Sequence, residues 1–102
     1  MRSVLALDIG GANLKAAHSG GAVRLQPFEL WKNPSGLTSE LRDLVQTLPA
    51  FDWLAATMTG ELCDCFDTKQ QGVNAILDAV EAVADGATVK VWQTDGRLVD
   101  MA

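Results

Sequence analysis

Short apolar runs separated by glycine pairs fill the first third of the chain. Val4 to Ile9 is almost continuously apolar, which is typical of a strand buried on both faces. Leu14 to His18 follows the pair Gly10-Gly11, and Val23 to Leu30, with partial alternation, follows Gly20-Gly21. Because glycine adopts positive φ at no steric cost, the pairs predict tight turns. The three runs therefore predict an antiparallel meander of strands.

Helical spacing replaces this pattern further along the chain. Apolar residues repeat at three- and four-residue intervals over 37–48 and again over 73–84, which predicts two amphipathic helices. Pro49 ends the first helix, while Thr68 and Gln71 form a capping box before the second and Gly86 stands at its C-cap. Each helix leads into a predicted strand, 53–58 and 88–92, and residues 97–102 carry no predicted element.

The resulting order, β-β-β-α-β-α-β, predicts one α/β domain over residues 1–102. Strands that follow a helix join the sheet parallel to the first strand through right-handed crossovers. We therefore expect a mixed five-stranded sheet in the order 3-2-1-4-5, with helices on its faces. This is the layout of a ribonuclease-H-like domain, and 102 residues suffice for one hydrophobic core.

Composition narrows the functional classes. Eight basic and 13 acidic side chains give a net charge of −5, which argues against nucleic acid held by charge alone. No apolar run approaches the ~20 residues that span a bilayer, and Asp8 interrupts the N-terminus too early for a signal peptide. Cys63 and Cys65 are too close for an ordinary disulfide framework. We expect a cytoplasmic protein with no membrane partner.

The segment Asp8 to Lys15 is the first candidate site. An acid at the end of a central strand enters a glycine turn, where the amides of Gly10 and Gly11 can form an anion nest. Asp8 could hold a metal ion or orient a nucleophile, and Asn13 or Lys15 could contact phosphate oxygens. The alternative is a hairpin in which the glycines supply geometry only, and the spacing does not decide between the two.

A second candidate follows the fourth predicted strand, at Thr59-Gly60-Glu61. Ligands of open sheets collect at the carboxyl ends of parallel strands, so Asp8 and Glu61 could share one site. Alternatively, Glu61 is a solvated loop acid. Lys69, in the first turn of a helix, opposes the helix dipole, which indicates either a role in the cleft or a solvated side chain.

Zinc binding is a weaker prediction. Cys63-Asp64-Cys65 supplies two soft ligands, and His18 is the single histidine of the chain. A structural zinc site takes four ligands, so two small side chains in a half-buried loop are the expected interpretation.

Two sequence blocks resemble a known family. Asp8 to Lys15 is similar to the first phosphate loop of actin, Hsp70 chaperones and sugar kinases. Met58 to Phe66, followed by Lys69, resembles the characteristic block of hydantoinase/oxoprolinase-related, tetrahydromethanopterin-linked C1 transfer pathway proteins, and Trp31 to Pro34 also fits. Archaeal members of that family act in methanofuran biosynthesis.

The resemblance implies a phosphate-handling enzyme that uses Mg²⁺ with ATP or a diphosphate substrate. The implied phosphate loop comprises Asp8, Gly10, Gly11, Asn13 and Lys15. The implied substrate side of the cleft comprises Thr59, Gly60, Glu61, Asp64 and Lys69, with Asp8, Glu61 and Lys69 in catalytic roles and Asp8 as the metal ligand. Family proteins continue into a second domain, so we expect the N-terminal half of such an enzyme, inactive alone.

Two further hypotheses remain from the residues. A non-enzymatic module would associate with itself or with a missing C-terminal domain through the apolar surface that a partner once covered. A two-metal nuclease on the same fold would pair Asp8 with Glu61, although nucleic acid would then approach a net-negative surface.

Overall fold

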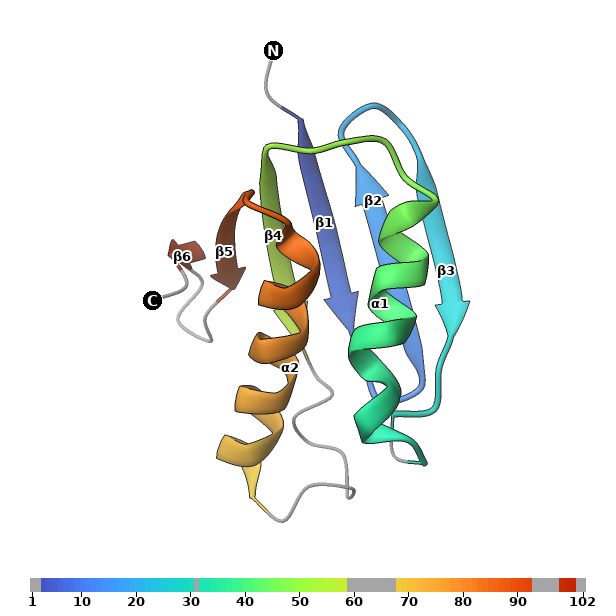
Figure 1. Cartoon of the computed structure of the whole chain (residues 1–102), viewed down its shortest axis with the longest axis vertical. Coiled ribbons are helices and arrows are strands. Elements are labelled where there is room, and N and C mark those ends of the chain that lie inside the picture. The colour runs from blue at the N-terminus through green and yellow to red at the C-terminus, as the bar shows by residue number, and fades with distance from the viewer. Residues whose placement is uncertain (1–2, 31, 59–67, 93–97, 101–102) are drawn as a thin grey trace.

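The computed structural model describes residues 3–30, 32–58, 68–92 and 98–100 (Figure 1). Their strands are β1 (Val4–Ile9), β2 (Asn13–His18), β3 (Val23–Pro27), β4 (Trp53–Met58), β5 (Thr88–Trp92) and β6 (Leu98–Asp100). Their helices are α1 (Leu37–Gln46) and α2 (Lys69–Ala84), with a short 3₁₀ helix, η1 (Pro34–Gly36), before α1.

The strands form one mixed sheet in the order β3-β2-β1-β4-β5-β6. β1 pairs antiparallel with β2 and parallel with β4, and β4 pairs parallel with β5. The predicted order 3-2-1-4-5 and the ribonuclease-H-like topology are therefore confirmed. The expectation that residues 97–102 carry no element was wrong, because β6 adds an antiparallel edge strand with Val99 opposite Val91.

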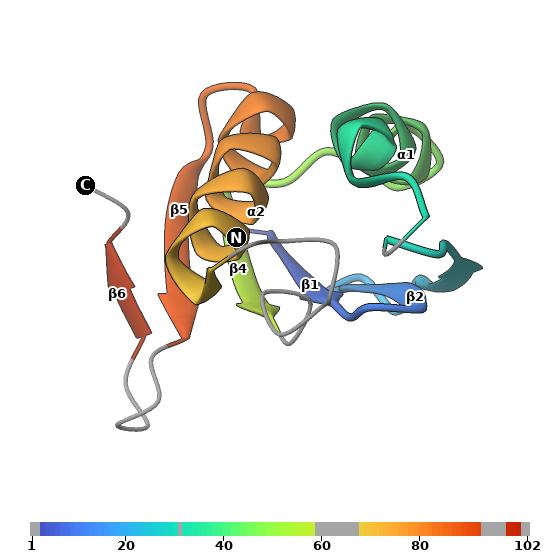
Figure 2. The same ribbon diagram turned by 90° about the horizontal axis from the view of Figure 1, so that it is seen from below.

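Both described helices lie on the same face of the sheet (Figure 2). The chain steps from β1 to β4 and from β4 to β5 in one direction across the sheet, and each right-handed crossover then places its helix on the same side. The sequence analysis predicted helices on the faces of the sheet. Among the described residues, both α1 and α2 lie on one face. We call the opposite face the open face.

The hydrophobic core lies between the sheet and this helix layer. Alternate residues of each central strand are buried, because successive strand side chains point to opposite faces. The core side chains include Leu5, Leu7 and Ile9 of β1, Leu14 of β2 and Leu54 of β4, against Leu37, Leu41 and Leu44 of α1 and Ile76, Val80 and Val83 of α2. On the open face Val4 and Ala6 are exposed, so the expectation that β1 is buried on both faces was wrong for the described structure.

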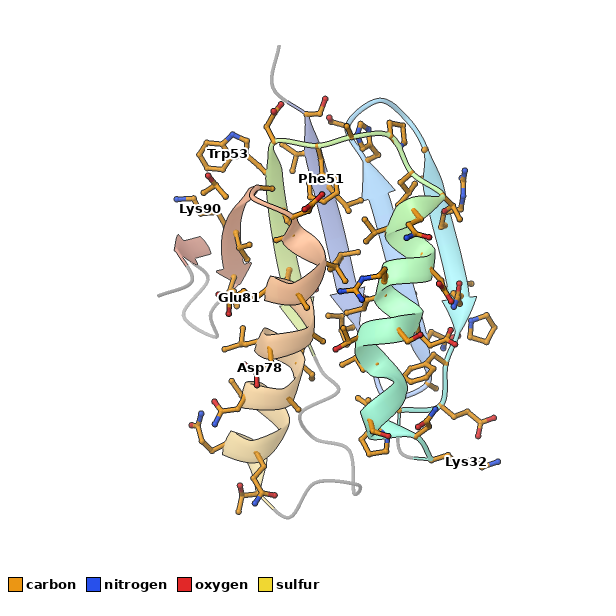
Figure 3. The ribbon with its side chains drawn as sticks, viewed as in Figure 1. Lys32, Phe51, Trp53, Asp78, Glu81 and Lys90 are labelled. Carbon is orange, nitrogen blue, oxygen red and sulfur yellow. The ribbon has the colours of Figure 1, made fainter. Side chains whose placement is uncertain are left out.

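Most element ends follow the expected local signals. Thr68 caps α2, its Oγ1 accepting a hydrogen bond from the Gln71 N–H at 3.1 Å. At the other end the C-cap is Asp85, with φ 51°, and Gly86, predicted at the C-cap, follows it with φ 85°. Asp78 and Glu81 are exposed on the outer side of α2 (Figure 3). Within the described residues, no helix is both long and apolar enough to cross a membrane.

The end of β3 differs from the prediction. The strand stops at Pro27 instead of Leu30 because the chain then runs along the β1–β2 turn. There the N–H of Phe28 donates to the carbonyl of Ala12 at 3.0 Å, and the N–H of Leu30 donates to the carbonyl of Gly11 at 2.9 Å. The side chains of Phe28 and Leu30 are buried, so the apolar pattern continues although the strand does not.

Candidate functional site

Asp8 lies on the open face, near the carboxyl end of β1. Its neighbours Leu7 and Ile9 face the core, so the half-buried Asp8 side chain faces the other way. Its register partners are Lys15 on β2 and Thr57 on β4. Three polar residues from adjacent strands therefore stand in one row across the sheet.

Thr57 contacts Asp8 directly. Its Oγ1 donates a hydrogen bond to Asp8 Oδ1 at 3.2 Å, between residues 49 positions apart in the sequence. The sequence reasoning missed Thr57. Parallel pairing of the first and fourth strands, aligned from their first residues Val4 and Trp53, would have placed it beside Asp8.

Lys15 is exposed directly across the β1–β2 pair from Asp8. Within the described part of the chain, no salt bridge joins the two side chains, and the ion pair found there is between Lys32 Nζ and Glu29 Oε2 at 3.0 Å. The ammonium group of Lys15 and the second oxygen of Asp8 are therefore both available to a ligand at this end of the sheet.

The β1–β2 turn supplies fewer amides than expected. The Gly10 N–H donates to the Asn13 carbonyl at 3.0 Å, so the prediction of an outward Gly10 amide was wrong. The sequence predicted positive φ in both glycine pairs. Neither Gly10 nor Gly11 has it, whereas Gly21 of the second pair has φ 106°. Among the hydrogen bonds of the described residues, the amides of Gly11 and Ala12 have no backbone acceptor.

Space is open beside Gly11. A Cβ atom built on this residue meets no heavy atom within 4 Å, so a ligand oxygen can approach the backbone there. The backbone N–H groups of Leu30 and Phe28 donate to the carbonyls of Gly11 and Ala12, and these two hydrogen bonds fix the turn. The exposed Asn13 follows this turn and begins β2. Two amides, one ammonium and one carboxylate thus gather around one end of β1 and β2.

The remaining predicted site residues lie outside the described structure. Thr59, Gly60, Glu61 and Asp64 fall in the undescribed range 59–67, as do both cysteines, and Lys69 is described only as the first backbone position of α2. A shared site for Asp8 and Glu61 therefore stays a prediction.

The described residues include Asp8, the predicted metal ligand, but no group of three or more metal-ligating side chains. Magnesium is commonly held by one or two carboxylates together with substrate phosphates and water. The oxygen atoms of Asp8 and Thr57 fit that donor chemistry when a phosphate ligand supplies the rest.

The sequence of this chain is similar to that of an archaeal synthase. No family model matches. The chain is 36% identical over 100 residues to (4-{4-[2-(gamma-L-glutamylamino)ethyl]phenoxymethyl}furan-2-yl)methanamine synthase of Methanocaldococcus jannaschii. The match covers 94% of this chain and 29% of the synthase. Among solved structures, RuvC of Thermus thermophilus aligns with a TM-score of 0.46 and 13% identity, over 87% of this chain and 60% of RuvC. The chain is thus similar, over nearly its whole length, to less than a third of that archaeal synthase.

Proposed function

We propose that this chain is the phosphate-binding part of an enzyme that builds a C1-transfer cofactor of the methanofuran type. The similarity to the archaeal synthase supports this pathway, and the two sequence blocks resemble the hydantoinase/oxoprolinase-related family within the actin, Hsp70 and sugar kinase superfamily. We expect binding without turnover, because the resemblance assigns the other transition-state contacts to a second domain.

The observation that carries this proposal is the gathering of unlike groups at one end of the sheet. Lys15 presents a cation, Gly11 and Ala12 present amide donors, and Asp8 presents a carboxylate oxygen. Amides and an ammonium bind phosphate oxygens, whereas the carboxylate repels them unless a cation lies between. A diphosphate that carries Mg²⁺ satisfies all three kinds of group.

In this proposal, Mg²⁺ is held by Asp8 and neutralises charge on the phosphates. Lys15 and the turn amides bind and orient the phosphate oxygens. The chain as a whole carries a net charge of −5, so a diphosphate without its metal is repelled. We therefore expect binding to depend strongly on Mg²⁺.

The test is an NMR titration of the chain with pyrophosphate, and separately with ATP, with and without Mg²⁺. Amide shifts should centre on residues 10–15 and on Thr57. Lys15→Gln should raise Kd roughly ten- to a hundredfold, since a hydrogen bond to a charged group contributes roughly 1.5–3 kcal/mol. Lys32→Gln, a change at an exposed lysine of the segment between β3 and η1, should leave Kd unchanged (Figure 3). Scattered shifts, or none at millimolar ligand, would refute the proposal.

A second candidate function, self-association, is favoured by the open face. Val23 and Leu25 of β3 are 68% and 63% exposed there, and Val4 of β1 is 38% exposed. On the same face, Val4, Trp53 and Ala55 line a hollow of about 250 Å³, and Lys90 Nζ lies 5.3 Å from the centroid of the Trp53 ring (Figure 3). Sheets with parallel strands are ordinarily covered on both faces. A second copy of the chain offers the same apolar surface, as a two-fold dimer requires.

The two-metal nuclease is not proposed. Its second acid, Glu61, lies outside the described residues, and nucleic acid would have to approach a chain with a net charge of −5.

A further inference from the structure

We infer that Thr57 is a positioning residue that keeps the Asp8 carboxylate from pairing with Lys15, an inference that rests on the proposed phosphate site. Asp8 stands between the two in the sheet, with Thr57 on the parallel neighbour β4 and Lys15 on the antiparallel neighbour β2. Both neighbours offer a donor to the same carboxylate. The structure shows the bond to Thr57, at 3.2 Å, and no salt bridge between Asp8 and Lys15.

The geometry of the sheet places Thr57 and Lys15 in direct competition for the Asp8 carboxylate. Directly opposed residues of an antiparallel pair have Cβ atoms roughly 4.5–5.5 Å apart, so Lys15 is within reach of Asp8. Next along the two strand pairs lie Ala6, Ala17 and Ala55, which are too small to separate the charged groups. The Thr57 hydroxyl is the donor observed on the carboxylate among the described residues.

An ion pair between Asp8 and Lys15 would hinder ligand binding in two ways. It would occupy the carboxylate oxygen that a metal ion needs, and it would neutralise the ammonium group that a phosphate needs. The bond to Thr57 draws the Asp8 carboxylate toward β4, away from Lys15 on β2, and it brings no charge. Oδ2 and the Lys15 ammonium therefore both stay available to a magnesium diphosphate. The chemical class of the ligand is thereby narrowed to one that presents a cation and an anion side by side.

The experiment compares Thr57→Val with Thr57→Ser. Valine keeps the shape and the β-branched backbone preference of threonine but removes the donor, whereas serine keeps the donor. Titration with magnesium pyrophosphate should show Kd raised five- to tenfold in Thr57→Val and changed less than twofold in Thr57→Ser. Because Thr57 is exposed, both variants should fold, and Thr57→Ala provides a second donor-free variant.

A second readout uses the protein without ligand. The ¹⁵N signal of the Lys15 ammonium should move in Thr57→Val as the ion pair with Asp8 forms, stay in place in Thr57→Ser, and return when Asp8→Asn is added to Thr57→Val. A merely structural role for Thr57 would not produce this pattern.

The outcomes separate the two proposals. If the wild-type chain fails to bind magnesium pyrophosphate, the proposed function is refuted. The Lys15 ammonium signal then still tests whether Thr57 keeps Asp8 from pairing with Lys15. If the wild type binds and Thr57→Val binds equally well, with an unmoved Lys15 signal, the role of Thr57 is overturned and the phosphate site stands.

Discussion

The imidazole of His18 bridges Ala50 and Gly20 through backbone groups. Its Nε2 lies 2.9 Å from the carbonyl oxygen of Ala50, 32 residues further along the chain, and its Nδ1 accepts a hydrogen bond from the Gly20 N–H at 2.9 Å. Nδ1 therefore carries no proton, and Nε2 is the donor. The side chain is 8% exposed. His18 ties the β2–β3 turn to the segment before β4, and the zinc role considered from the sequence does not fit a ring whose two nitrogens both have partners.

Replacing His18 with Phe should lower the free energy of unfolding by about 1–3 kcal/mol. The ring size is kept, but the Gly20 amide and the Ala50 carbonyl lose their partner. Urea unfolding measures the loss. Added Zn²⁺ should leave the imidazole signals of the wild-type protein unmoved, and a zinc-induced shift would contradict the structural role.

Thr68→Ala should destabilise the protein by about 0.5–2 kcal/mol. The change removes the hydroxyl that accepts from the Gln71 N–H at the start of α2. Thr68→Ser keeps this acceptor and is the control, so it should retain most of the stability. Equal losses in thermal unfolding for both variants would show that the cap is not the cause.

Gly11→Ala should weaken magnesium pyrophosphate binding while leaving the fold intact. Gly11 has no positive φ and open space around its Cβ position, so alanine is tolerated but stands where a phosphate oxygen would approach. Gly86→Ala is the opposite case, because φ 85° strains an alanine although space is open. It should cost about 1–2 kcal/mol of stability and leave Kd unchanged. NMR titration with parallel unfolding curves separates the two effects.

Leu25→Glu should shift the chain toward monomer if the open face mediates self-association. It places a charge on a residue that is 63% exposed on the edge strand β3. Arg24→Glu, at the next residue of β3, is the control, since alternate strand residues face opposite sides. Sedimentation of the wild type at high concentration comes first, and a strictly monomeric wild type would rule out the dimer.

Local patterns in the sequence account for most of the architecture. Runs such as 4–9 and helical spacing such as 37–48 predict elements that the structure contains, because periodic burial and capping depend on neighbours a few residues apart. The sheet order followed as well, because right-handed crossovers leave few ways to arrange strands separated by helices. The structure also places Asp8 near a glycine turn and opposite Lys15, whereas a functional site there stays a prediction.

Contacts between segments distant in the sequence could not be predicted from these local patterns. The bond from Thr57 to Asp8 depends on the register of β4 against β1, and a shift of one residue would turn Thr57 to the core. The partners of His18, the use of the Gly10 amide within its own turn, and the pairing of the three-residue β6 likewise depend on which backbone groups meet in space. A hydrogen bond requires positions accurate to a few tenths of an ångström, and only the packed sheet and helices bring residues 49 positions apart to that accuracy.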